Sequence, residues 1–233
     1  RLCSAQPAAI ILTDRNPATK NLRNKTKASG IPLFTATARD NIVLDNLQYY
    51  AGRFLAQKAT LHGVFLEVLG MGVLLTGHSA VGKSELALEL ITRGHSLIAD
   101  DAPEFTRIAP DIVNGTCPPL LREFLEVRGL GILDIRAMFG DSAIKNNMYL
   151  HLVVHLKRMR QNEIADIDRL QIMDEQRTVL GVEIPEITVP VAPGRNLAIL
   201  VETAVRNHML KQKGYNGAEH FIKRQKKAIE DNQ

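Results

Sequence analysis

VLLTGHSAVGKSE, the stretch from Val73 to Glu85, joins an apolar run to the pattern G-x-x-x-x-G-K-S and predicts a strand, a phosphate-binding P-loop and the start of a helix. Gly77 and Gly82 allow the backbone to curl so that its N–H groups point at phosphate oxygens. Lys83 would reach the β- and γ-phosphates of a nucleotide, and the Ser84 hydroxyl would bind Mg²⁺. The predicted nucleotide-binding residues are Gly77, His78, Ser79, Ala80, Val81, Gly82, Lys83 and Ser84.

Two adjacent acids, Asp100 and Asp101, follow the next apolar run along the chain. A helix that ends near Gly94 would separate this second strand from the first, giving a βαβ unit. Because ligands bind beyond the carboxyl ends of such strands, both acids are expected at the P-loop edge of the sheet. Acids beside a P-loop suit phosphoryl transfer to a hydroxyl, in which a carboxylate receives the proton of the acceptor. Successive strand residues point to opposite faces, so one acid is predicted to be the base and the other a metal or structural partner.

The composition is that of a packed globular protein, with 233 residues of which 45% are hydrophobic. The formal charge of +4 gathers near the C-terminus, where it predicts a solvated helix face first and an acidic partner surface second; we expect no nucleic acid partner. Since the only cysteines are Cys3 and Cys117, we expect no disulfide framework and a cytoplasmic location. The sequence contains no run of about 18 apolar residues, so we expect no membrane span.

The first 56 residues are predicted to form a small N-terminal α/β domain. Residues 8–12 and 31–35 are expected to be strands, Asn16–Pro17 the start of a helix ending near Gly30, and Asp40–Leu55 a second helix. Because nothing in this domain suggests chemistry, we expect a regulatory or assembly role. The first residue is Arg rather than Met, so we expect the domain to be incomplete.

Residues 57–233 are predicted to form the P-loop catalytic domain, entered through a linker at Gln57–Thr60. Leu120–Glu126 is predicted to be a short helix, and Val127–Ile135 a glycine-punctuated loop that enters a strand. Asn196 and Asn216 are the predicted N-caps of the last two helices. Further strands are predicted at residues 61–69, 149–156 and 186–191.

A P-loop indicates a bound nucleotide but not the reaction. The guanine-reading pattern Asn-Lys-x-Asp does not follow the loop, which argues against a regulatory GTPase. Ala102 follows Asp101 where a transport or motor ATPase would carry a water-activating Glu. Besides phosphoryl transfer to a hydroxyl of a protein, two other functions stay open. One is a small-molecule kinase with an enclosed pocket and a mobile lid, and the other is a module that uses ATP as a switch without transferring phosphate.

Three segments resemble one known family: the P-loop, Ile98–Asp101 and, most specifically, Leu125–Asp134 with the sequence LEVRGLGILD. They are similar to HPr kinase/phosphorylase, the bacterial enzyme that phosphorylates and dephosphorylates a seryl hydroxyl of the phosphocarrier protein HPr. The resemblance runs from about Thr60 to the C-terminus. It implies a mixed-sheet fold like that of phosphoenolpyruvate carboxykinase, a homo-oligomer that is a hexamer, and a regulatory role in the phosphotransferase system and carbon metabolism.

The same resemblance implies Mg²⁺-dependent transfer from ATP or pyrophosphate to the serine. In the reverse direction, inorganic phosphate would attack the phosphoserine and yield pyrophosphate. Asp101 would accept the serine proton and donate it in the reverse reaction. The other catalytic residues implied are His62, Lys83 and Arg169, and the implied Mg²⁺ ligands are Ser84 and Glu126.

Further site residues are implied with less definite roles. Arg195 ends a segment, Pro190–Arg195, that matches the part of the family tied to dephosphorylation. Asp100 would partner Asp101, while Arg128 belongs to the LEVRGLGILD signature and could alternatively cap a helix end with Glu126. His78 and Ala80 stand where other members often carry an acid and a glycine, a difference that leaves phosphate binding by the backbone intact.

Overall fold

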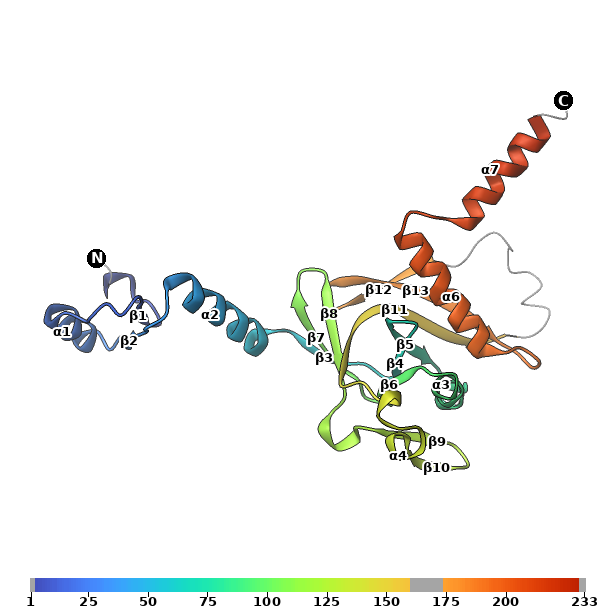
Figure 1. Cartoon of the computed structure of the whole chain (residues 1–233), viewed down its shortest axis with the longest axis horizontal. Helices are drawn as coiled ribbons and strands as arrows, with labels where there is room; N and C mark the ends of the chain where they lie inside the picture. Colours follow the sequence, from blue (N-terminus) through green and yellow to red (C-terminus); the bar gives the residue numbers. More distant parts are fainter. Residues whose placement is uncertain (1–2, 160–173, 231–233) are drawn as a thin grey trace. The chain divides into compact units, whose positions relative to one another are not determined.

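The computed structural model of the chain describes residues 3–159 and 174–230. The chain divides into two compact units, Arg1–Ala56 and Gln57–Gln233, each with its own sheet. The smaller unit, drawn in blue in Figure 1, contains η1 (Cys3–Ala5), β1 (Ile10–Leu12), α1 (Lys20–Ala28), β2 (Leu33–Thr35) and α2 (Asp40–Leu55).

The smaller unit has the predicted strand, helix, strand, helix order, and β1 and β2 pair in parallel. The predicted start of its first helix was wrong. Asn16 donates its side-chain N–H to the Thr13 carbonyl (2.9 Å) and closes the turn after β1, so it does not cap a helix. Thr19 is the N-cap of α1, since its hydroxyl accepts the N–H of Leu22 (3.3 Å).

The larger unit is built on a nine-stranded mixed sheet. Its strands are β3 (Lys58–Thr60), β4 (Val64–Val68), β5 (Met71–Gly77), β6 (Ser96–Ala99), β7 (Glu104–Ala109), β8 (Ile112–Thr116), β11 (Asn147–Arg158), β12 (Asp174–Val179) and β13 (Val182–Val191). A separate hairpin consists of β9 (Phe124–Val127) and β10 (Gly131–Asp134). The helices are α3 (Lys83–Thr92), α4 (Ile135–Phe139), α6 (Leu197–Gln212) and α7 (Gly217–Glu230), with short 3₁₀ turns η2 (Pro119–Leu121) and η3 (Asp141–Ala143).

The long strand β11 is the centre of this sheet. It pairs in parallel with β5 on one side and with β13 on the other, and its first residues pair with β8. On the far side of β5 lies β4, which is antiparallel to both β5 and β6. Strands β5, β6 and β11 therefore run in the same direction, and their carboxyl ends lie at one edge, as predicted for the first two.

Both faces of the sheet are buried, which explains the continuous apolar run of β5. Val73 and Leu75 pack in one hydrophobic core with α3 and α6, the helices that Figure 1 shows on that face. Leu74 points the other way, into a second core that contains Phe105 of β7 and Ile184 of β13. The strand β5, which leads into the loop before α3, is thus packed on both faces, which makes it a rigid base for a site.

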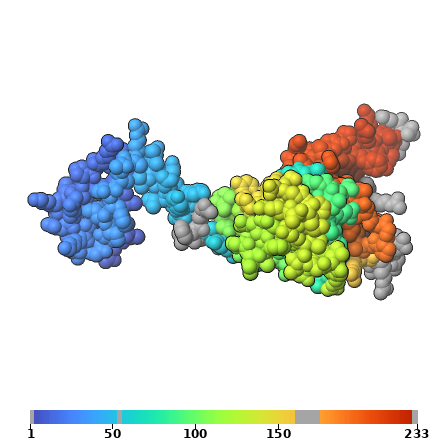
Figure 2. Space-filling model, turned by 60° about the horizontal axis from the view of Figure 1, so that its bottom comes forward, coloured from blue at the N-terminus to red at the C-terminus, as the bar shows by residue number. Residues whose placement is uncertain are grey.

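Two local predictions in this unit were wrong. The expected linker contains β3, which pairs with β7 through Ala59 and Phe105. The expected helix at Leu120–Glu126 is replaced by η2 and β9, because burial alternates along β9, with Leu125 and Val127 inside and Glu126 exposed. The LEVRGLGILD signature is therefore a β-hairpin. It belongs to the yellow-green surface of the larger unit in Figure 2.

Candidate active site

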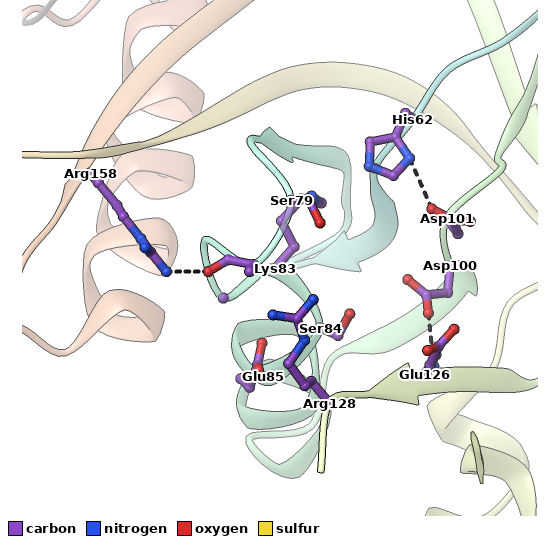
Figure 3. Close-up of a pocket in the computed structure, with 13 residues that line it drawn as sticks. His62, Ser79, Lys83, Ser84, Glu85, Asp100, Asp101, Glu126, Arg128 and Arg158 are labelled. Atoms are coloured by element: carbon purple, nitrogen blue, oxygen red, sulfur yellow. Dashed lines mark hydrogen bonds and ion pairs between the residues drawn. The ribbon is translucent and has the colours of Figure 1, made fainter. Parts of the chain in front are cut away.

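A polar cavity of about 300 Å³ opens at the carboxyl edge of β5 and β6 (Figure 3). It brings together residues from the loop after β5, the turn after β6, the segment before β4 and the β9–β10 hairpin. The lining residues are His62, Gly63, Ser79, Ala80, Gly82, Lys83, Ser84, Glu85, Asp100, Asp101, Glu126, Arg128 and Arg158. Most of the predicted site residues are thus neighbours in space.

The glycine-rich loop, Gly77–Ser84, has the backbone that its sequence predicts. Gly77 and Gly82 adopt φ values of +141° and +106°, a region that favours glycine. A Cβ atom on Gly77 would also lie 2.6 Å from the Leu156 carbonyl oxygen of β11, so the loop needs glycine for space as well. Val81 is buried under the loop, and its N–H donates to the His78 carbonyl (3.2 Å).

Lys83 is the buried cation of the loop. Its side chain is at the first residue of α3, and the residue is 9% exposed. The ammonium donates to the carbonyl oxygens of Gly77 (3.0 Å) and His78 (3.3 Å). These neutral acceptors keep the charge at the cavity wall, where a phosphate oxygen would be a stronger, charge-assisted partner.

Asp101 stands at the mouth of the cavity with His62. Its Oδ1 lies 2.9 Å from His62 Nδ1, and both side chains are mostly exposed, at 73% and 62%. Strand β6 ends at Ala99, so Asp101 follows the strand in a turn with φ of +62°, and its carbonyl accepts the N–H of Gly63 (3.3 Å). This second contact ties the segment that carries His62 to the turn that carries the carboxylate.

Asp100 takes a different place from its neighbour. Its Oδ2 accepts the backbone N–H of Glu126 (2.9 Å), so it fastens the β9–β10 hairpin to the end of β6 (Figure 3). Burial raises the pKa of Asp100, an effect that the hydrogen bond from Glu126 opposes. The two acids therefore make separate contacts, Asp100 with the hairpin and Asp101 with His62.

The hairpin brings one acid and one cation to the cavity. Glu126 lies in β9 and Arg128 directly after it, and neither caps a helix, contrary to the alternative interpretation of these residues. Ser84, from the first turn of α3, shares the cavity with Glu126. Mg²⁺ is usually held by one or two carboxylates together with phosphates and water, so a hydroxyl and a carboxylate here fit that ion. The described ranges contain no group of three or more His, Cys, Asp or Glu side chains placed to hold a metal by themselves.

Arg195 is exposed in the turn between β13 and α6 and does not line the cavity. Arg169 lies outside the described residues.

The cavity also contains residues that the sequence analysis missed, of which Arg158 has the largest charged group. In the sequence, Arg158 is a basic residue at the carboxyl end of a strand. That position indicates a place near the glycine-rich loop only once the pairing of β11 with β5 is known. In the part of the chain that the structure describes, no helix is long and apolar enough to cross a membrane.

Known proteins are similar to this chain in sequence and in fold. A family model described as the HPr Serine kinase C-terminal domain matches residues 53–225. The chain is 49% identical over 231 residues to the HPr kinase/phosphorylase of Stenotrophomonas maltophilia (strain R551-3), covering 99% of this chain and 73% of that protein. The HPr kinase/phosphorylase of Xanthomonas euvesicatoria pv. vesicatoria (strain 85-10) is 48% identical over 231 residues, with coverage of 99% and 73%.

A solved structure is also similar, that of the Hpr(Ser) kinase/phosphatase from Coxiella burnetii. It has 38% sequence identity and a TM-score of 0.62, and the match covers 70% of this chain and 98% of that one. Together with the cavity, these likenesses define an enzyme of the protein kinase and phosphorylase class. The chain belongs to the HPr kinase/phosphorylase family, as the LEVRGLGILD signature indicated.

Proposed function

We propose that this enzyme transfers the γ-phosphoryl group of ATP, or a phosphoryl group of pyrophosphate, to a serine of an HPr-like carrier protein. In the reverse direction, inorganic phosphate would remove the group from the phosphoserine and yield pyrophosphate. The observation that carries the proposal is the His62–Asp101 pair at the open mouth of a cavity whose wall holds the Lys83 ammonium. A serine on a protein surface can reach an exposed carboxylate, whereas an enclosed pocket would exclude it.

The chemistry needs one proton acceptor at that mouth. As the serine Oγ attacks, its proton passes to the Asp101 carboxylate, the Oγ–P bond forms, and the bond from phosphorus to the β-phosphate oxygen breaks, releasing ADP. In phosphorolysis an oxygen of inorganic phosphate attacks the phosphoserine, the P–Oγ bond breaks, and protonated Asp101 returns the proton to Oγ. In both directions the Asp101 carboxyl group changes between its ionised and its protonated form. One residue can therefore serve both reactions.

The remaining groups would bind the phosphates, neutralise their charge and orient the Asp101 carboxylate. Lys83 and the backbone N–H groups of the glycine-rich loop would bind the phosphates. His62, at 2.9 Å from Asp101, would orient the carboxylate toward the serine. Ser84 and Glu126 would hold Mg²⁺, which would supply positive charge against the phosphates. Arg169 is proposed as a further catalytic residue from the family resemblance.

We extend the proposal from the resemblance to the setting of the enzyme. It would be a cytoplasmic hexamer that regulates the phosphotransferase system and carbon metabolism, with no nucleic acid or membrane partner. Its sheet would resemble that of phosphoenolpyruvate carboxykinase, and the unit Arg1–Ala56 would serve regulation or assembly.

Incubation of the chain with γ-labelled ATP, Mg²⁺ and a purified HPr-like carrier tests the proposal. We expect label on a serine of the carrier, and its loss when inorganic phosphate is added, with labelled pyrophosphate as product. Turnover only with small hydroxyl compounds would replace the proposal by a metabolite kinase. Nucleotide binding without any transfer would replace it by a nucleotide-gated module.

A further inference from the structure

Arg158 approaches the glycine-rich loop from the side opposite to the acids. It is the last residue of β11, and the register that pairs Leu156 with Gly77 places it alongside the loop. Asp101 follows β6, which is separated from β5 by β4 on the other side. Figure 3 shows the same arrangement, with Arg158 on one side of Lys83 and the pair of His62 and Asp101 on the other.

The guanidinium of Arg158 contacts the loop directly. Its Nη2 donates to the carbonyl oxygen of Ala80, a residue with φ of +61°. The side chain is exposed and lines the cavity, and within the described residues no carboxylate lies at ion-pair distance from it. A guanidinium has five N–H donors, so a neutral carbonyl leaves most of its capacity and all of its charge available for an anion.

In in-line phosphoryl transfer, the two sides of the loop have different roles. The attacking and leaving oxygens lie on opposite sides of the phosphorus that is transferred. If Asp101 takes the proton of the attacking serine, the leaving oxygen points away from Asp101. That direction is the side of the loop from which Arg158 approaches, and negative charge develops there as the bond breaks.

We propose that Arg158 is a further catalytic residue, which binds the leaving-group end of the polyphosphate, exchanging the Ala80 carbonyl for a phosphate oxygen. The end it takes is the β-phosphate of a nucleotide, or the inorganic phosphate that occupies the same place in phosphorolysis. When the bond to the transferred phosphorus breaks, its electron pair stays on the leaving oxygen, and the guanidinium stabilises that charge without exchanging a proton. Since the proposed function defines which end leaves, this role rests on it.

Equilibrium binding of ADP and of inorganic phosphate to the full chain tests the role without a carrier protein. Arg158→Met should weaken both ligands at least about tenfold, as expected for the loss of a charge-assisted contact, and Arg158→Lys by a smaller factor, because an ammonium cannot form the fork. Lys157→Met is the matched control: it removes the same charge from the adjacent exposed residue, which does not line the cavity. This control should stay within about twofold of wild type, because neighbouring strand residues point to opposite faces.

Single-turnover transfer at saturating ATP adds a second readout. Under this condition weaker ATP binding no longer lowers the rate. The Arg158→Met rate should still fall at least about tenfold, because the charge at the leaving oxygen grows in the transition state. Unchanged ADP and phosphate affinities in Arg158→Met would overturn the role, and so would an equal loss in Lys157→Met, which would show a general charge effect. If the wild type binds ADP through Arg158 but labels no carrier, the proposed function fails and the phosphate contact stands.

Discussion

Replacement of Asp101 by Asn tests the proton acceptor at the mouth of the cavity. Asn has nearly the shape of Asp but cannot take a proton from an attacking hydroxyl. Because the side chain is 73% exposed and pairs with the exposed His62, no buried contact is lost and the fold should be unchanged. Ligand binding should also persist, since Lys83 and the glycine-rich loop are untouched.

The expected loss is that of general base catalysis, about 10²- to 10⁴-fold in rate. At about 1.4 kcal/mol per factor of ten, this corresponds to roughly 3 to 6 kcal/mol of transition-state stabilisation. Both directions should lose activity together, because the same carboxyl group accepts the proton in one and donates it in the other.

The assay measures initial rates of label transfer to the carrier and of phosphate-driven removal, with ADP affinity determined on the same preparation. Asp100→Asn is the matched control, since an Asn side chain can still accept the N–H of Glu126. We expect it to cost less than about tenfold, well below the range for a lost base. Transfer by Asp101→Asn at a rate close to that of wild type would refute the assignment, and a larger loss in Asp100→Asn would move the base to that residue.

Three further predictions concern the segment of Arg195, an ion pair at the C-terminal end of α3, and the glycine-rich loop. Arg195→Ala should slow dephosphorylation more than phosphorylation, measured as the ratio of the two rates; equal losses would speak against a separate role for its segment. Glu202→Gln should destabilise the protein at neutral pH, because Arg93 holds the pKa of Glu202 at about 2, below its usual 4.5. This contribution is present above pH 4.5 and is lost as the pH falls toward 2, so thermal unfolding of the two proteins should converge in acid; a constant difference would contradict it. Gly77→Ala should weaken phosphate binding by roughly 5- to 150-fold, because its φ of +141° and the nearby Leu156 carbonyl force the loop to shift at a cost of about 1–3 kcal/mol; unchanged affinity in a titration would show that the loop adapts.

Much of the frame of the site follows from local sequence. The glycine spacing of Gly77–Ser84 predicted the strand, loop and helix around it, because those backbone angles depend on few neighbours. The bounds of α2 and the N-cap Asn196, whose Oδ1 accepts the N–H of Ile199 (2.9 Å), also matched the prediction. Helix caps and glycine turns depend on hydrogen bonds between residues close together in the sequence, so they can be predicted from one segment of the chain.

Other features depend on which faces are buried and which strands are paired. The signature segment was expected to begin as a helix, yet the burial of Leu125 and Val127 makes it a strand, which the segment alone does not reveal. The hairpin of β7 and β8 was also missed, and so was β12, although each strand pairs with its neighbour along the chain. The core that these strands bury into is distant in the sequence, since Phe105 and Ile184 pack in one cluster with Leu74.

The electrostatic details of the cavity arise in the same way. The raised pKa of Asp100 follows from its burial, and the His62–Asp101 pair from a contact between one segment that precedes the glycine-rich loop in the sequence and one that follows it. Arg158 reaches the loop only because β11 pairs with β5 in a register that aligns Leu156 with Gly77. The residue types that bind phosphate could therefore be read along the chain. Their proposed division into an attacking side and a leaving side depends on the strand order of the sheet, since that order determines which charged residues lie on each side of the loop.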